Sequence, residues 1–135
     1  GEVADSYSLS AVSGDSSVGG LVGANGASGG RYGTHLCGFF ARCYSIGMVS
    51  GSGWNVGGLV GDWSYGSSTA CFWDTQTSGQ TWSVEGTGKT TAEMQTAVTF
   101  LEAGWDLVDE TANGTEDIWW ILEGKDYPRL WWENK

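Results

Sequence analysis

The sequence predicts an all-β protein, a parallel β-solenoid closed by a C-terminal cap of one short α-helix and β-strands. Two observations lead to this fold class. The hexapeptide Val-Gly-Gly-Leu-Val-Gly occurs at Val18–Gly23 and again at Val56–Gly61. The composition also changes near residue 80, because most glycines precede that point and most charged residues follow it. A repeat with glycine-rich corners and short strands is typical of solenoids.

A longer repeat surrounds the hexapeptide and occupies residues 1–80. Ser6–Gly14 aligns with Cys43–Gly51, and a third copy begins at Cys71. The first copy is longer than the second, and we interpret residues 29–40 as a loop inserted into it. Strands of successive copies would pair in parallel, so that aligned residues of the copies lie side by side.

The hexapeptide itself predicts a corner of the repeat. We expect Leu21 and Leu59 to point inward, where they would form part of the core. Gly19–Gly20 and Gly57–Gly58 would allow backbone conformations or close contacts that a Cβ atom prevents.

The C-terminal segment, residues 81–135, is predicted to cap the repeats. Thr90 and Glu93 have the spacing of a capping box, and apolar residues follow at helical intervals, which predicts a helix over about 91–103. Gly104 lies where such a helix would end. Two strands are expected after it, at Asp117–Glu123 and Tyr127–Glu133. Caps of this kind cover the open edge of a repeat array.

The pattern CYS-x-G-x-VSG followed by VGGLVG resembles the GLUG-motif repeat of large bacterial surface proteins. These include adhesins and the non-catalytic parts of immunoglobulin A peptidases. The terminal segment of such arrays is similar to CFWDTQTSGQ (71–80), GTGKTTAEMQ (86–95), TFLEAGWD (99–106) and WWILEGKDYPRLWWE (119–133). The resemblance implies a β-solenoid, an extracellular or cell-surface location and a structural or adhesive role. It implies no catalytic residue.

Charge and hydropathy exclude several classes of partner. The formal net charge is −10 and the isoelectric point is about 4.2. Such a chain lacks the basic surface that nucleic acids or anionic membranes require. No run reaches the roughly 18–20 apolar residues of a membrane span. The chain begins at Gly1 without a methionine, and we interpret it as a processed form or a fragment.

Motifs for catalysis or cofactors are incomplete, so the sequence predicts no enzyme, no cofactor and no metal site. Gly86–Thr91 resembles the end of a phosphate-binding loop, but Ser83 replaces the required first glycine, and a turn before a helix is the simpler interpretation. His35 is the only histidine and lies in the insert. Two acidic pairs could hold calcium or act as paired carboxylates, although solvated surface charge is the plainer alternative: Asp106 with Asp109, and Glu116 with Asp117.

Cysteine and sequon positions leave two modifications open. Cys43 and Cys71 are expected to face inward as thiols, because neighbours on parallel strands rarely meet disulfide geometry. Cys37 could form a disulfide with Cys43 if the insert folds back, which an extracellular setting would permit. Asn113 begins a glycosylation sequon, and its Asn-Gly step also suits a plain turn.

The tryptophans give the remaining functional indication. Trp119–Trp120 and Trp131–Trp132 are adjacent pairs in predicted strands, so the members of each pair face opposite sides. Either both sides are covered, or some rings form an exposed platform for sugars or for another subunit. We expect Tyr7, Trp120 and Trp131 to make such contacts.

The sequence therefore predicts a non-enzymatic structural or adhesive protein of the bacterial cell surface. The first copy has no covering segment before it, so we expect the chain to self-associate end to end into a fibre or filament, unless upstream repeats of a longer chain cover that edge. A carbohydrate-binding module that uses exposed tryptophans is an alternative. A glycan-degrading β-helix enzyme is a further one.

Overall fold

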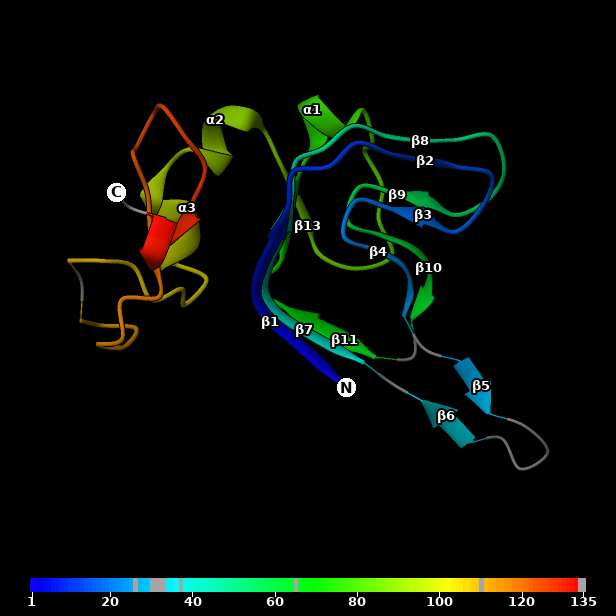
Figure 1. Cartoon of the computed structure of the whole chain (residues 1–135), viewed down its shortest axis with the longest axis horizontal. Coiled ribbons are helices and arrows are strands. Elements are labelled where there is room, and N and C mark those ends of the chain that lie inside the picture. Colours follow the sequence, from blue (N-terminus) through cyan, green and yellow to red (C-terminus); the bar gives the residue numbers. More distant parts are fainter. Residues whose placement is uncertain (26, 30–33, 37, 65, 110, 134–135) are drawn as a thin grey trace. The chain divides into compact units, whose positions relative to one another are not determined.

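The computed structural model describes residues 1–25, 27–29, 34–36, 38–64, 66–109 and 111–133. The chain divides into two compact units, Gly1–Lys89 and Thr90–Lys135 (Figure 1). The composition changes near residue 80, yet residues 81–89 belong to the first unit. The reason is that strand β13 (Thr87–Lys89) pairs with the strand that begins at Phe72.

The first unit contains one five-stranded sheet in which the strands run parallel. The strand order is β1-β7-β12-β13, and β11 also pairs with β7. The bounds of these strands are β1 Glu2–Ser8, β7 Phe39–Ser45, β11 Ser67–Thr69, β12 Phe72–Asp74 and β13 Thr87–Lys89. The sheet joins the beginnings of all three repeat copies.

Three two-stranded parallel sheets join the rest of the first copy to the rest of the second. They pair β2 with β8, β3 with β9 and β4 with β10. Their bounds are β2 Val12–Gly14, β3 Val18–Gly19, β4 Val22–Asn25, β8 Val49–Gly51, β9 Val56–Gly57 and β10 Val60–Ser64. β5 (Ala27–Gly29) and β6 (Thr34–Leu36) pair antiparallel. This pair begins before the predicted insert of residues 29–40, and the last two residues of that insert, Phe39 and Phe40, belong to β7.

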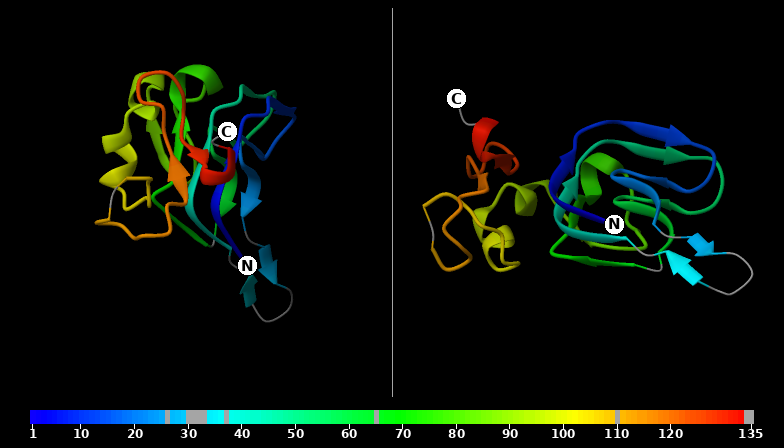
Figure 2. Two further views of the ribbon diagram at one scale, coloured as in Figure 1. Left: turned by 60° about the vertical axis from the view of Figure 1, so that its left-hand side comes forward. Right: turned by 60° about the horizontal axis from the view of Figure 1, so that its bottom comes forward.

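The two complete copies pair at aligned residues, with a shift of register between Asp62 and Ser64 in the pair β4–β10. Ser6 lies opposite Cys43, Tyr7 opposite Tyr44 and Val12 opposite Val49, as the sequence alignment of the copies gives. The rings of Tyr7 and Tyr44 are stacked, with centroids 5.1 Å apart and an interplanar angle of 6°. Figure 2 shows the two copies following the same path side by side. Aligned residues of the two copies therefore lie opposite one another, and two of these pairs, Tyr7–Tyr44 and Val12–Val49, are identical.

Equivalent positions of the copies also share an unusual backbone conformation. Asp5, Arg42 and Ala70 have φ angles of 48°, 53° and 55°, and each immediately precedes the aligned residues Ser6, Cys43 and Cys71. A left-handed φ is uncommon for residues other than glycine. Its recurrence at one place in three copies means that the local bend belongs to the repeat, whatever side chain occupies it.

The core of the first unit lies between the copies. Its buried cluster consists of Phe40, Cys43, Leu59, Val60, Cys71 and Trp73. Leu59 is fully buried, and Leu21 is half-buried against the same cluster, so both point inward as predicted. A Cβ atom at Gly58 would overlap the Trp73 indole, which explains why this corner requires glycine.

The predicted parallel β-solenoid is wrong. The described strands form one five-stranded and five two-stranded sheets, and the parallel pairs do not continue as stacked rungs. The third copy ends early, because the chain leaves β12 into helix α1 (Thr75–Ser78). The Asp74 carboxylate begins this helix by accepting hydrogen bonds from the backbone N–H groups of Gln76 and Thr77, at 2.8 and 3.0 Å. No third glycine corner follows to extend the smaller sheets.

The C-terminal unit replaces the predicted single helix over 91–103 with two short ones. Helix α2 spans Thr91–Met94 and α3 spans Ala97–Leu101. The predicted capping box is confirmed, since Thr90 and Glu93 exchange both hydrogen bonds. Between the helices Thr96 is extended, at φ −116° and ψ 124°. The backbone N–H of Ala97, which begins α3, donates to the Glu123 carboxylate at 3.0 Å, so a distant side chain stabilises the break.

The strands of this unit are also shorter than predicted. In place of strands over 117–123 and 127–133, β14 (Trp119–Trp120) pairs antiparallel with β15 (Arg129–Leu130). A 3-10 helix, η1, follows at Trp131–Glu133. The core is aromatic and fully buried: the Trp105 ring lies 4.8 Å from that of Phe100 and 4.6 Å from that of Trp119, centroid to centroid.

Candidate functional site

The outer edge of the first copy is one candidate interaction site. Strand β1 lies at the end of the five-stranded sheet, and β2, β3 and β4 are each one edge of a two-stranded sheet. The second copy differs, because its backbone is bonded by the segment that follows it. The N–H of Gly58 donates to the Trp82 carbonyl, and the N–H of Val84 donates to the Val60 carbonyl. Among the described strands, none pairs with the outer edge of β1.

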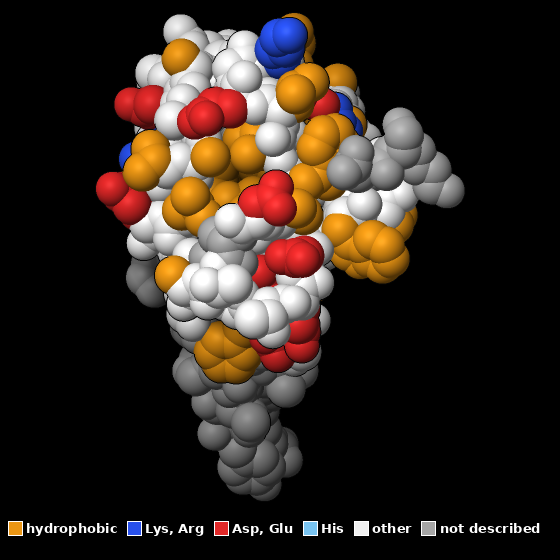
Figure 3. Space-filling view, turned by 90° about the vertical axis from the view of Figure 1, so that its left-hand side faces the viewer, with side chains coloured by type: hydrophobic (Ala, Val, Ile, Leu, Met, Phe, Trp, Pro, Cys, Tyr) orange, Lys and Arg blue, Asp and Glu red, His pale blue; other side chains and the backbone are white. Residues whose placement is uncertain are grey.

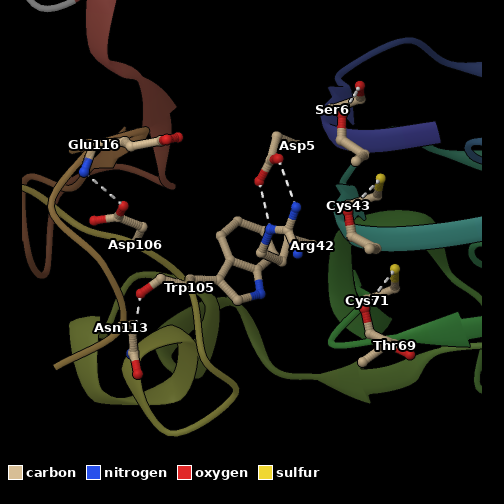
Figure 4. A network of polar contacts seen from close by, with 12 residues as sticks. Asp5, Ser6, Arg42, Cys43, Thr69, Cys71, Trp105, Asp106, Asn113 and Glu116 are labelled. Carbon is tan, nitrogen blue, oxygen red and sulfur yellow. Dashed lines mark hydrogen bonds and ion pairs between the residues drawn. The ribbon is translucent and has the colours of Figure 1, made fainter.

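An ion pair holds β1 against β7. Arg42 donates from Nε to Asp5 Oδ1 at 2.7 Å and from Nη2 to Asp5 Oδ2 at 2.8 Å (Figure 4). The hydrogen bond with Asp5 raises the pKa of Arg42 above its usual value. Both side chains are partly exposed, so the pair fixes geometry more than it adds stability. Tyr7 lies two residues further along the same strand.

Two cysteine thiols lie in the core beneath this sheet. Cys43 and Cys71 are buried and free, as predicted. Figure 4 shows Cys43 on β7 and Cys71 just before β12, with the Cys43 sulfur 3.3 Å from the Ala41 carbonyl and the Cys71 sulfur 3.4 Å from that of Thr69. The hydrogen bond with Cys43 and burial raise the pKa of Cys71, which keeps this thiol protonated. Cys37 lies outside the described residues, and the Cys37–Cys43 disulfide stays a prediction that would require oxidation of the Cys43 thiol, which is free in this structure.

The C-terminal unit contains a cavity of about 290 Å³. Its walls come from α3, from the segment after Trp105 and from the end of β14. The lining residues are Ala97, Leu101, Leu107, Val108, Asp109, Trp120 and Ile121. Figure 3 shows apolar side chains gathered at the centre of one face of this unit, with acidic side chains at the border. The lining side chains are therefore mostly apolar, and one carboxylate, that of Asp109, lies among them.

Two polar groups of the cavity lining have opposite hydrogen-bonding character. The Trp120 indole N–H is buried and has no hydrogen-bond partner, and it is alone in this among the buried side-chain nitrogens and oxygens of the described residues. Asp109 is exposed and has a left-handed backbone, with φ at 70°. Trp120 thus lines the cavity while its N–H is buried away from solvent, and the acceptor in the lining is the Asp109 carboxylate.

Among the acidic residues that the sequence singled out, Asp106 has a structural role. Asp106 is buried and accepts hydrogen bonds from the backbone N–H groups of Glu116 at 3.0 Å and Asp117 at 3.3 Å. The Asp106 carboxylate therefore closes the loop that runs from Asp106 to Asp117 (Figure 4). In the part of the chain that the structure describes, no three His, Cys, Asp or Glu side chains are arranged to hold a metal ion.

Asn113 takes part in the same loop. Its amide nitrogen donates to the Leu101 carbonyl at 2.9 Å and to the Trp105 carbonyl at 3.1 Å. A glycan on this nitrogen would compete with both bonds. Glycosylation of Asn113 stays a prediction, and it would have to precede or disrupt this packing.

The predicted contact residues lie in different surroundings. Tyr7 is half-buried on the edge strand, Trp120 lines the cavity and Trp131 is exposed at 58%. The side chain of His35 lies outside what the structure describes. Sequence reasoning gave Val108 no role, took Ala97 only as an apolar position of the predicted helix, and considered Asp109 as a calcium ligand or paired carboxylate rather than as part of a cavity.

Comparison with known proteins identifies no relative: no family model, no curated protein and no solved structure matches the chain significantly. Among the described residues, no helix has the length and apolar character needed to cross a membrane. The functional argument therefore depends on the chain's own geometry.

Proposed function

We propose that this chain is a non-enzymatic structural or adhesive protein of the bacterial cell surface or extracellular space. We further propose that it self-associates through the outer edge of its first repeat copy. The resemblance of its repeat to the GLUG motif of bacterial surface proteins supports the location. The observation that carries the proposal is the in-register pairing of the two copies, with β1 left at the edge.

Strand addition is the mode of association that this edge favours. An edge strand presents backbone amides and carbonyls to another strand, and such pairing is a general route to association. The repeat already pairs with its own sequence through Ser6–Cys43 and Tyr7–Tyr44. A further copy of the repeat would find the same register on the other side of β1.

The positions of the backbone groups identify a variant that tests the edge alone. The Gly1 carbonyl accepts from the Phe39 N–H, and the Ser8 carbonyl accepts from the Ile46 N–H. The direction of the backbone groups alternates from Gly1 to the bend at Asp5, where φ is 48°. Gly1 and Val3 therefore face β7 and the N–H of Ala4 faces the outer edge, and the bend resets the alternation so that Ser8 faces β7 again. Ala4→Pro removes that outward N–H and leaves the bonds to β7 in place.

Sedimentation velocity of the intact chain, over a range of micromolar concentrations, tests this proposal. We expect assembly that grows with concentration, loss of assembly in Ala4→Pro, and unchanged assembly in Ala4→Val, which keeps the N–H. Circular dichroism would verify that both variants fold. A wild-type chain that stays monomeric, or an Ala4→Pro variant that assembles like wild type, would contradict the proposal.

A further inference from the structure

The cavity of the C-terminal unit has the form of a small-ligand site, which self-association through β1 does not require. Ligand sites are concave, largely apolar and carry a few polar groups that orient the ligand. Six of the seven lining side chains are aliphatic or aromatic, and Asp109 supplies the one carboxylate. The volume of about 290 Å³ lies at the lower end of known ligand pockets, about 300 Å³, so the cavity suits a small ligand.

The exposure of the lining side chains distinguishes a base and a mouth of this cavity. Leu107 is only 3% exposed, so the base is aliphatic. Leu101, Trp120 and Ile121 are half-buried and form walls above it. Asp109 is exposed, which places its carboxylate at the mouth. A ligand that fits this arrangement has an apolar end for the base and a polar end for the mouth.

The charge of the C-terminal unit favours a cation at this mouth. Residues 90–135 contain ten Asp and Glu residues but only three Lys and Arg residues. Figure 3 shows acidic side chains around the apolar centre of one face of the unit. Among the described residues of the unit, the ion pair is that of Arg129 with Asp126, so no described lysine or arginine neutralises Asp109. Such a surface attracts cations and repels carboxylates and phosphates.

The hydrogen-bonding groups of the lining favour a ligand that donates. The Asp109 carboxylate accepts hydrogen bonds and has none to donate. The Trp120 N–H is buried away from solvent, so the indole lines the cavity with its ring carbons. An ammonium group meets both requirements of the mouth, because it carries positive charge and acts only as a donor. A neutral hydroxyl also donates, but it gains nothing from the charge.

We propose that this cavity binds a small organic amine, with the hydrocarbon part against Leu107 and the ammonium group on Asp109. The direction of entry distinguishes a free amine from a lysine side chain of another protein. A lysine side chain enters with its ammonium group first, which would bury the charge against the aliphatic base. A free amine enters with its hydrocarbon end first and keeps the ammonium group at the mouth, where Asp109 accepts from it.

Isothermal titration calorimetry with a charge series tests the proposal. Phenylethylamine is the cationic probe, phenylethanol its neutral analogue and phenylpropanoate the anion, and hexylamine is an amine with an aliphatic body. We expect saturable binding of at least one amine, roughly two- to fivefold weaker binding of phenylethanol than of phenylethylamine, and no binding of the anion; the factor is the range of an exposed ion pair. N-acetyl-lysinamide is the probe for a lysine side chain. No binding of either amine, equal binding of amine and alcohol, or tighter binding of the lysine probe would overturn the proposal.

Two matched variants locate the ammonium group. Asp109→Asn removes the charge, and asparagine is well tolerated at the φ of 70° found here. It should weaken amine binding by roughly two- to fivefold and leave alcohol binding unchanged. The control Glu116→Gln removes the same charge from an exposed side chain outside the lining, and should leave amine binding close to wild type. Equal weakening in both variants would show that net charge alone attracts the amine, and would overturn the proposal.

Amide chemical shifts locate the hydrocarbon part of the amine. The spectra are recorded on the Ala4→Pro chain, in which the edge of β1 is blocked, so that binding is measured apart from the proposed assembly. The amine that binds best should shift the amide signals of Leu107 and Ile121 and leave those of Val18 and Val56 in the repeat unit unchanged. Shifts at these two lining residues that saturate with the calorimetric affinity support the proposal. A saturating amine that leaves both signals in place would put the amine elsewhere and overturn it.

Discussion

The two units of this chain are stabilised by different interactions. The first unit pairs two copies of one sequence in small parallel sheets, and its corner depends on the absence of side chains at residues such as Gly58. The second has only short elements and is ordered by large side chains, with Phe100, Trp105 and Trp119 fully buried together. Backbone pairing dominates one unit and aromatic packing dominates the other.

This difference indicates how each unit responds to change. In the repeat unit, strands of successive copies pair in the same register, so the edge strand β1 can accept a further strand. In the C-terminal unit, irregular segments are held by single side-chain bonds, such as the bond from Ala97 to the Glu123 carboxylate. The irregular packing of the C-terminal unit leaves a cavity. The regular strand pairing of the repeat unit instead leaves β1 as an edge strand.

The strongest test of the comparison is a charge in the core of the repeat unit. Leu59→Asp places an unpaired carboxylate at a fully buried position, so we expect the repeat unit to unfold. Leu21→Asp should cost less, because Leu21 is half-buried. Far-ultraviolet circular dichroism and thermal melting measure both effects. A Leu59→Asp variant that melts like wild type would show that Leu59 does not anchor this core.

A second test removes one ring from the aromatic core. Trp105→Ala deletes a fully buried side chain and should lower the free energy of unfolding by about 3–5 kcal/mol. Trp132→Ala, at a ring that is 54% exposed, should change it by less than about 0.5 kcal/mol. Urea denaturation followed by tryptophan fluorescence gives both values. Equal effects of the two substitutions would refute the central role of aromatic packing.

The smallest expected effect concerns acid. Burial raises the pKa of Asp126, but hydrogen bonds from Arg129 and from the backbone of Tyr127 outweigh it and lower the pKa below its ordinary value of 3.8. A lowered pKa in the folded state means that the contribution is complete at neutral pH. It is lost as the pH falls through 3.8 and below.

Thermal melting between pH 7 and pH 2 measures this contribution. Asp126→Asn should remove part of the acid sensitivity of the C-terminal unit and leave melting of the repeat unit unchanged. The effect should be small, because both partners of the ion pair are partly exposed. Identical pH profiles in wild type and variant would rule out a role for this carboxylate.

The register of the copies could be predicted from the sequence, and the extent of the sheets could not. Pairing of Tyr7 with Tyr44 follows from self-similarity, because parallel pairing in register places like residues together. The solenoid expectation failed at Asp74, whose carboxylate begins a helix where the third copy should have continued. An aspartate before Thr75 is itself a helix-start signal, but the repeat pattern suggested a strand instead.

The candidate cavity was only partly visible in the sequence. Trp120 stood out because it is one of two adjacent tryptophans whose side chains face opposite sides. The break between α2 and α3 gave no signal, since Met94, Ala97 and Leu101 keep helical spacing across it. The acceptor that stabilises the break comes from Glu123, far along the chain, and only the folded structure brings it there.

The glycine corner limits how the two copies can evolve. A Cβ atom at Gly20 would overlap the Gly58 carbonyl oxygen, so a residue of the first copy is constrained by the backbone of the second. A duplicated sequence normally diverges freely, since one copy can change while the other keeps the function. Here a side chain at Gly20 strains the backbone of the second copy, while a side chain at Gly58 displaces the Trp73 indole. Descendants of this gene should therefore keep glycine at residue 20 even where other residues of the first copy diverge.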